Sequence, residues 1–106
     1  MNDTVFAKII AGKIPTHFEY EDDICVVFKS IDPKDKTHLL VVPRKPILSI
    51  MDMEEGDEKI VGHLVLVAKN IAKEKELKGY QLWFNVGKDG GQEIFHLHLH
   101  LISKFA

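Results

Sequence analysis

The chain has 106 residues, the usual length of one domain, and is 45% hydrophobic and 28% charged, as ordinary globular proteins are. This composition excludes the disordered, collagen-like and low-complexity classes. No apolar run approaches the roughly 18 residues that a membrane span needs, and the N-terminus lacks the pattern of a secretory signal. We therefore expect a single domain over residues 1–106 and no membrane partner.

The charge is nearly balanced, with 14 basic and 16 acidic residues and a net charge of −2. A field this weak and mixed does not predict a nucleic-acid partner. The only cysteine, Cys25, has no second thiol for an internal disulfide and lies in an apolar stretch. We expect a buried core thiol and a reducing, cytoplasmic location.

The N-terminal half predicts one short helix and three strands. Asp3 or Thr4 can cap a helix that runs through Ala11, because apolar residues follow at helical spacing. Alternating or apolar runs predict strands over residues 17–21, 24–28 and 38–42, separated by Asp- and Pro-rich turns.

The C-terminal half predicts a long helix over residues 54–76. One face of it carries Ile60, Leu64, Val67, Ala68 and Ile71. Two further strands are expected over residues 80–86 and 95–102, on either side of a glycine-rich loop. The fold class is therefore α+β: a five-stranded antiparallel sheet with one long and one short helix.

The most informative stretch is His96-Leu97-His98-Leu99-His100-Leu101, which holds three of the six histidines. Alternate side chains of a strand share a face, so the leucines should pack under the long helix and the imidazoles should lie opposite. At roughly 3.3 Å per residue, His98 is about 6–7 Å from each neighbouring histidine. Outside the row, His17 and His63 are expected to be solvated.

This row of histidines has three possible interpretations. It is a chance exposed strand face, a zinc site with a third ligand from elsewhere, or a nucleophile that attacks phosphorus with neighbouring groups managing protons. The preceding loop, with Asn85 and several glycines, favours the nucleophile, because backbone amides near glycine can approach an anion closely.

The row, preceded by Gly90-Gly91-Gln92, resembles the signature of the histidine triad (HIT) superfamily. Several N-terminal motifs are similar to those of its Hint branch, the nucleotide-binding phosphoramidases, in a bacterial-like form; they are Phe6-Ala7-Lys8-Ile9-Ile10, Ile14-Pro15, Tyr20-Glu21-Asp22-Asp23 and Thr37-His38-Leu39-Leu40-Val41-Val42-Pro43. The resemblance implies the same five-stranded fold and a homodimer in which the two sheets form one continuous layer.

The resemblance also implies an activity, the hydrolysis of the P–N bond of purine nucleoside 5′-phosphoramidates of the adenosine type, without cofactor or metal. His98 would be the nucleophile that forms a nucleotidyl-histidine intermediate, and His96, His100 and His38 would complete the catalytic set. The implied nucleotide-binding residues are Val5, Phe6, Ile9, Phe28, Ser30, Ile31, Leu40, Asn85, Gly91, Gln92, Glu93, His98 and His100.

Two positions depart from the branch pattern. Ser30 stands where the branch usually has an aspartate that binds ribose hydroxyls, and Pro46 stands where it often has a histidine. Two alternatives therefore stay open: a dinucleoside polyphosphate hydrolase of the Fhit branch, and a nucleotide-binding module with little turnover. The motifs at residues 6–10 and 20–23 favour the phosphoramidase over the Fhit branch.

Overall fold

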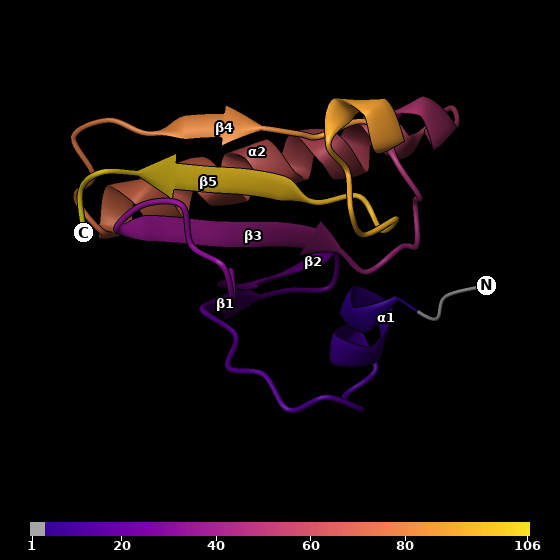
Figure 1. Ribbon diagram of the computed structural model, residues 1–106, viewed down its shortest axis with the longest axis horizontal. Coiled ribbons are helices and arrows are strands. Elements are labelled where there is room, and N and C mark those ends of the chain that lie inside the picture. The colour runs from indigo at the N-terminus through magenta and orange to yellow at the C-terminus, as the bar shows by residue number, and fades with distance from the viewer. Residues whose placement is uncertain (1–3) are drawn as a thin grey trace.

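The computed structural model describes residues 4–106 and has a five-stranded antiparallel sheet in the order β1-β2-β3-β5-β4 (Figure 1). The strands are β1 Tyr20–Glu21, β2 Cys25–Lys29, β3 Thr37–Pro43, β4 Gln81–Trp83 and β5 Leu99–Ser103. The helices are α1 Val5–Ile10 and α2 Asp57–Glu74, with short 3₁₀ turns η1 Ile50–Asp52 and η2 Lys88–Gly90. The predicted fold class is confirmed.

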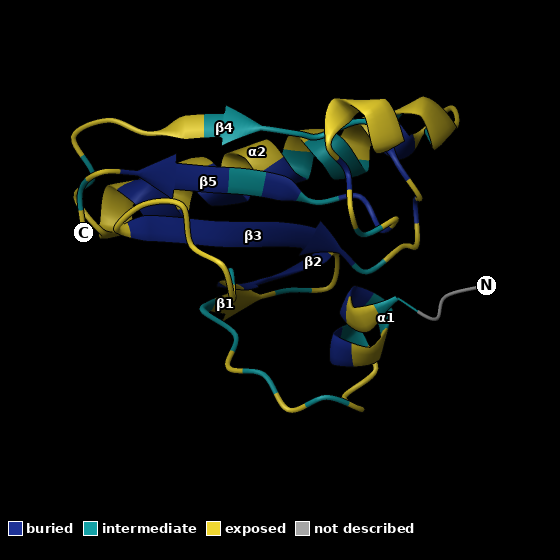
Figure 2. Cartoon of the chain, viewed as in Figure 1, coloured by how far each residue is buried: buried dark blue, intermediate teal, exposed yellow. Residues whose placement is uncertain are grey.

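The central strand β3 is buried along its whole length because β2 and β5 flank it and both faces of the sheet are covered (Figure 2). On one face, side chains of the three central strands pack against α2; they include Cys25, Val27, Leu39, Val41, Leu99 and Leu101. On the other face, a second cluster joins α1 to the sheet and contains Phe6, Ile9, Val26, Phe28, Leu40 and Val42. The two faces of the sheet therefore have different neighbours.

The long helix α2 buries much of the stripe that the sequence predicts. Leu64, Val67, Ala68 and Ile71 are buried, whereas Ile60 is only partly so. The helix begins at Asp57, later than residue 54, because the Asp57 carboxylate accepts the main-chain N–H of Glu54 at 2.8 Å and is paired with Lys45. Among residues 4–106, the structure has no helix that is long and apolar enough to cross a membrane.

The short helix α1 is capped by Thr4, whose hydroxyl oxygen accepts the main-chain N–H of Ala7 at 3.1 Å. The other predicted cap, Asp3, lies outside the described residues. Phe6 and Ile9 lie one turn apart and are both buried against the sheet. Their burial fixes α1 on the face opposite α2.

Three predicted strands are longer than the strands observed, because strand pairing stops before the apolar pattern does. β1 pairs with β2 through only Tyr20 and Glu21, and β4 pairs with β5 through three residues. β5 begins at Leu99, not at residue 95, because the N–H of Leu97 donates to the main-chain oxygen of Ile47 (2.7 Å). The alternating burial nevertheless extends back to Leu97, which is 1% exposed.

The packing of α2 predicts a large difference between two of its leucines. Replacing fully buried Leu64 by alanine leaves a cavity beneath the helix, so we expect a loss of about 2–5 kcal/mol in the free energy of unfolding. The matched control is Leu66→Ala on the half-exposed side of the same helix, where the expected loss is below about 1 kcal/mol. Urea unfolding measures both, and equal losses would contradict the assigned face.

Candidate active site

Four histidines gather on the sheet face opposite α2. In β5, His100 lies across from Leu40 of β3 and Trp83 of β4. The His100 ring centroid is 4.9 Å from that of His98 and 5.1 Å from that of His38. The strand alternation that the sequence predicts thus places His98 and His100 next to each other, and β3 adds His38.

The His98 ring is held in one protonation state by a single hydrogen bond. Its Nδ1 lies 2.8 Å from the main-chain oxygen of His96, and because a carbonyl only accepts, Nδ1 carries the proton. In the neutral ring, Nε2 then keeps its lone pair. The Phe6 ring packs edge-on against this imidazole, with 4.9 Å between the centroids. His98 is therefore a fixed imidazole with a nucleophilic nitrogen.

His96 has a different environment from the other members of the row. It is 2% exposed, and its Nε2 donates to the main-chain oxygen of Pro43 at 2.7 Å. This bond ties the segment before β5 to the end of β3. The bond thereby helps to fix the main-chain carbonyl of His96 that accepts from His98. The His96 ring itself is buried.

His38 and His100 form a directed pair that starts in the loop before β3. The main-chain N–H of Lys34 donates to Nδ1 of His38 at 3.1 Å. Nε2 of His38 lies 2.9 Å from Nδ1 of His100. Among residues 4–106, Nε2 of His100 is the one buried side-chain polar atom without a hydrogen-bond partner. The pair therefore ends at an unpaired nitrogen beside His98.

All four imidazoles favour the neutral form. Burial lowers the pKa of His38, His96 and His98 below the usual histidine value. For His100, burial and then the neighbouring His98 and His38 lower the pKa to about 4. Near pH 7 the row therefore presents uncharged rings, and the nucleophilic nitrogen of His98 is free of a proton.

The residues expected to form the apolar slot divide into two groups. Phe6, Ile9, Phe28 and Leu40 belong to the buried cluster under α1. Val5 and Ile31 lie outside this cluster, 40% and 102% exposed. Ser30 is half-buried; its N–H donates to the main-chain oxygen of His38, and its hydroxyl accepts from the N–H of Asp32. The structure thus brings Ser30 to His38 and Phe6 to His98.

The glycine-rich loop differs from the expected cradle of free amides. The N–H groups of Gly90, Gly91 and Gln92 donate to carbonyls of Gly87 and Lys88 within the loop. The Gln92 side chain is 4% exposed, accepts from Gly87 N–H, and donates to main-chain oxygens of Leu48 and Ile94. These three amides and this side chain shape the loop, because their hydrogen-bonding groups are already used.

Asn85 and Gly91 lie together at the surface of this loop. A Cβ on Gly91, whose φ is 88°, would lie 3.3 Å from the Asn85 side-chain nitrogen, so glycine suits both the backbone and the space. The Asn85 amide donates to the main-chain oxygen of Gly90 at 3.0 Å. Glu93 is exposed. The structure thus brings Asn85 and Gly91 together, whereas the Glu93 side chain makes no hydrogen bond or ion pair with residues 4–106.

Two residues beside the row were not expected from the sequence. The ring centroid of Trp83 is 5.8 Å from that of His100. A count along the paired strands would have found it, because Trp83 is opposite His100 in the register. Lys34 acts through its main-chain N–H, and no side-chain pattern signals such a contact.

Comparisons with known proteins show the family of this chain. A sequence profile described as "Scavenger mRNA decapping enzyme C-term binding" matches residues 3–106. The chain is 41% identical over 102 residues to an uncharacterised HIT-like protein of Synechococcus elongatus, covering 95% of this chain and 90% of that one. It is 36% identical over 103 residues to the purine nucleoside phosphoramidase of Escherichia coli, covering 95% and 87%. The chain belongs to the histidine triad superfamily.

Solved structures agree with this assignment. A HIT family hydrolase from Legionella pneumophila superposes with a TM-score of 0.92 at 38% identity, over 98% of this chain and 95% of that one. The identity and the coverage together show that this HIT protein has the same fold as that family member.

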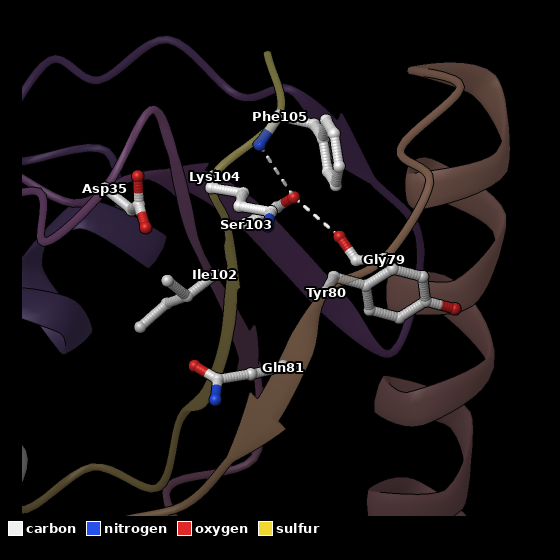
Figure 3. A pocket seen from close by; sticks show the side chains of 8 residues that line it. All are labelled: Asp35, Gly79, Tyr80, Gln81, Ile102, Ser103, Lys104 and Phe105. Carbon is white, nitrogen blue, oxygen red and sulfur yellow. Dashed lines mark hydrogen bonds between the residues drawn. The ribbon is translucent and has the colours of Figure 1, made fainter.

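A cavity of about 320 Å³ lies away from the histidines, where β4 begins and β5 ends (Figure 3). Tyr80, Gln81 and Lys104 line it, and Ser103 closes its floor with a 2.6 Å bond to the main-chain oxygen of Gly79. Both charged and apolar groups border it without converging on one point. None of the four clustered histidines lines this cavity.

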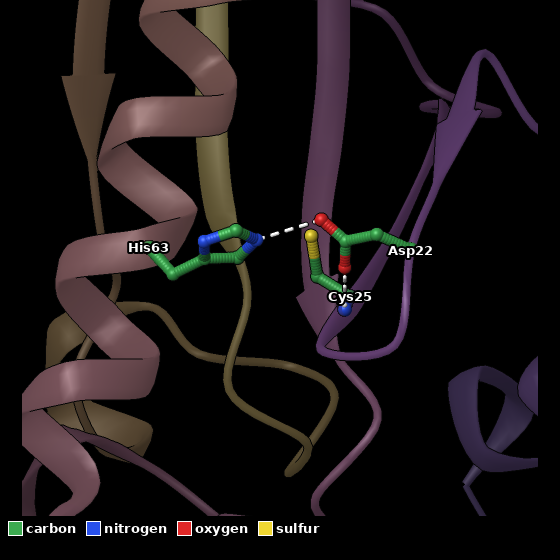
Figure 4. Close-up of side chains that lie close together, drawn as sticks. All are labelled: Asp22, Cys25 and His63. Carbon is green, nitrogen blue, oxygen red and sulfur yellow. Dashed lines mark hydrogen bonds and ion pairs between the residues drawn. The ribbon is translucent and has the colours of Figure 1, made fainter.

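A second group of metal-binding residue types joins the β1–β2 turn to α2 (Figure 4). The Asp22 carboxylate lies 2.7 Å from Nε2 of His63, which corrects the expectation that His63 is solvated. The same carboxylate accepts the N–H groups of Ile24 and Cys25, both at 2.8 Å. Burial and the charge of Asp22 raise the pKa of the Cys25 thiol to about 12. The Asp22 carboxylate already has its hydrogen-bond partners, and the neighbouring Cys25 thiol is protonated. The group therefore links the β1–β2 turn to α2.

This tie predicts a specific loss of stability. Asp22→Ala leaves two main-chain N–H groups and His63 without their acceptor, so we expect a loss of about 1–3 kcal/mol in the free energy of unfolding. The control is Asp23→Ala at the exposed neighbouring position, with an expected change within about 0.5 kcal/mol.

The contribution of Asp22 should depend on pH. Burial opposes its charge, but hydrogen bonds from His63 and from the N–H groups of Cys25 and Ile24 hold its pKa well below the usual carboxyl range. Its stabilisation is thus fully present above the unfolded pKa of about 3.9 and is lost as the pH falls below that value. Urea unfolding of both variants at neutral and acid pH measures this, and a pH-independent difference would contradict the role.

Proposed function

We propose that this HIT protein hydrolyses the P–N bond of purine nucleoside 5′-phosphoramidates of the adenosine type. The observation that carries the proposal is the pairing of two ring nitrogens: the lone pair on Nε2 of His98 and the unpaired Nε2 of His100 next to it. One is a nucleophile for phosphorus, and the other offers a proton to a phosphate oxygen. The phosphoramidase of E. coli, a relative, supports the choice of substrate.

In the first step, the lone pair of His98 Nε2 attacks the α-phosphorus, and the bond from phosphorus to the amine nitrogen breaks. The amine leaves with the bonding electron pair and takes up one proton from water. The product on the protein is a nucleotidyl-His98. His98 can act in this way because its Nδ1–H is held by the His96 carbonyl while Nε2 forms the new bond.

In the second step, a water molecule attacks the same phosphorus and the bond to His98 breaks. The electron pair returns to Nε2, and the proton that water releases balances the proton taken up by the amine. The nucleoside monophosphate leaves. A hydrogen bond from His100 to a phosphate oxygen stabilises the charge that develops in both steps, and no cofactor or metal enters the scheme.

The nucleotide is proposed to lie between α1 and the loop before β3. Val5 and Ile31 are the exposed apolar residues assigned to it, Phe6, Ile9, Phe28 and Leu40 form the buried cluster, and Ser30 is joined to His38 through its main-chain N–H. Asn85, Gly91 and Glu93 are assigned to the phosphate and leaving-group side. Gln92 is proposed to hold the loop in shape, because its side chain is consumed within it.

The protein is also proposed to be a cytoplasmic homodimer. The outer edge of β4 is the end of the sheet, and α2 and the segment before β4 carry the exposed apolar residues Val65, Leu66 and Tyr80. Pairing two such edges would extend the sheet across the dimer, as the family resemblance implies.

The deciding experiment is the hydrolysis of adenosine 5′-phosphoramidate by the wild type and His98→Ala, with the released monophosphate quantified. We expect at least about a thousandfold loss of turnover in the variant, because the nucleophile is removed. The variant should stay folded, since His98 is only partly buried at the edge of the core. The matched control, His17→Ala, changes a histidine whose side chain is 85% exposed and should keep full activity.

The same assay separates the alternatives. A wild type that cleaves diadenosine polyphosphates faster than the phosphoramidate would favour the dinucleoside polyphosphate hydrolase. A wild type that binds adenosine monophosphate but turns over neither substrate would favour a binding module. Full activity in His98→Ala would rule out the covalent mechanism.

The lowered histidine pKa values predict the pH profile of kcat/KM. Protonation of His98 removes the lone pair that attacks phosphorus, so activity falls as the pH drops through its pKa. Because burial lowers that pKa, the acid limb should lie below about 6.5, the ordinary histidine value. Initial rates from about pH 4 to pH 9 measure the profile. An acid limb at or above 6.5 would contradict a desolvated nucleophile.

A further inference from the structure

The His38–His100 pair begins in the loop between β2 and β3, at the main-chain N–H of Lys34, which can only donate a hydrogen bond. We propose that the main-chain N–H of Lys34 is a positioning group that fixes the tautomers of His38 and His100 and so holds the Nε2 proton of His100 toward the substrate. The consequence for the substrate rests on the proposed function. The tautomers themselves do not, because they belong to the free protein.

The first step of the argument is the direction of each hydrogen bond. A main-chain amide only donates, so Nδ1 of His38 must accept from Lys34 at 3.1 Å. His38 is 5% exposed and its ring is neutral, so its proton is on Nε2. That proton points to Nδ1 of His100 at 2.9 Å, which must therefore accept. The proton of neutral His100 is then on Nε2, the nitrogen without a partner.

The second step concerns what this arrangement prevents. To give its Nε2 proton away, His100 would need a replacement at Nδ1 from His38. His38 would in turn need a proton at Nδ1, where the Lys34 amide already donates and gives up no proton. The pair is therefore not a proton wire. His100 acts as a fixed hydrogen-bond donor, and the proton for the leaving amine comes from elsewhere.

The third step is why an exposed loop can hold the amide in place. Residues 31–36 are all exposed, yet the loop is tied twice to the same buried residue. The N–H of Ser30 donates to the main-chain oxygen of His38 at 3.0 Å, and the N–H of Lys34 donates to its ring. The Ser30 hydroxyl also accepts from Asp32 N–H at 3.2 Å. His38 thereby holds the loop in place, and the loop amide in turn fixes the tautomer of His38.

The direct test is nuclear magnetic resonance of the whole 15N-labelled protein without substrate. Long-range correlations between ring protons and ring nitrogens distinguish the two neutral tautomers of each histidine. In the wild type we expect the proton on Nε2 in His38 and His100, and on Nδ1 in His98. A proton on Nδ1 of His38, or a charged His38 near pH 7, would overturn the proposal without any variant.

Two substitutions at one position separate the amide from the side chain. Lys34→Ala keeps the N–H, and we expect all three tautomers unchanged. Lys34→Pro removes the N–H, and we expect His38 to populate the form protonated at Nδ1, with a matching change in His100. If the proline variant does not fold, a backbone ester at position 34 removes the same N–H with less disturbance. Unchanged tautomers in a folded variant that lacks the N–H would overturn the proposal.

Activity then tests the consequence for catalysis. Loss of an oriented donor to the phosphate should lower kcat for adenosine 5′-phosphoramidate by about tenfold to a hundredfold, with a smaller change in KM. If the tautomers change and the wild type hydrolyses no phosphoramidate, the proposed function fails but the positioning role stands. If they change while kcat stays the same, His100 is not the donor and the inferred consequence fails.

Discussion

Neutral imidazoles buried against a sheet must each place one donor and one acceptor, and this constraint organises the site. The carbonyls of Pro43 and His96 accept hydrogen bonds from the rings of His96 and His98, and the amide of Lys34 donates one to Nδ1 of His38. Each partner is a main-chain group whose role cannot reverse, so the tautomers follow from the fold. The neighbouring rings of His98 and His100 each keep an Nε2 without a hydrogen-bond partner among residues 4–106.

The two-residue period of strands gives the sheet its two unlike faces. Leu97, Leu99 and Leu101 lie beneath α2, and the histidines between them meet α1 and β4 instead. The same residues thus supply the apolar core and the reactive row, so a shift of β5 by one position would exchange the two. Stability of the core and correct placement of the histidine row are the same requirement in this segment.

The sequence predicts the parts of this molecule that depend on local period and fails where distant groups meet. The long helix, the five strands and the histidine row follow from spacing. The lengths of β1, β4 and β5 do not, because strand pairing stops before the apolar pattern does; before β5, the N–H of Leu97 donates to the main-chain oxygen of Ile47 instead. The Asp22–His63 pair and the bond from the Gln92 side chain to the main-chain oxygen of Leu48 link residues far apart, and neither leaves a pattern along the chain.

A site made of uncharged rings has a physical consequence for catalysis. Protonating His100 would give Nδ1 a proton that faces the Nε2–H of His38, so one bond of the row would break. The geometry therefore favours the neutral form independently of burial, and both effects act in the same direction. A buried donor without a partner costs about 1–3 kcal/mol in the free protein. An anionic oxygen that accepts from it removes that cost, so the free protein favours an anionic acceptor at His100, beside the His98 ring.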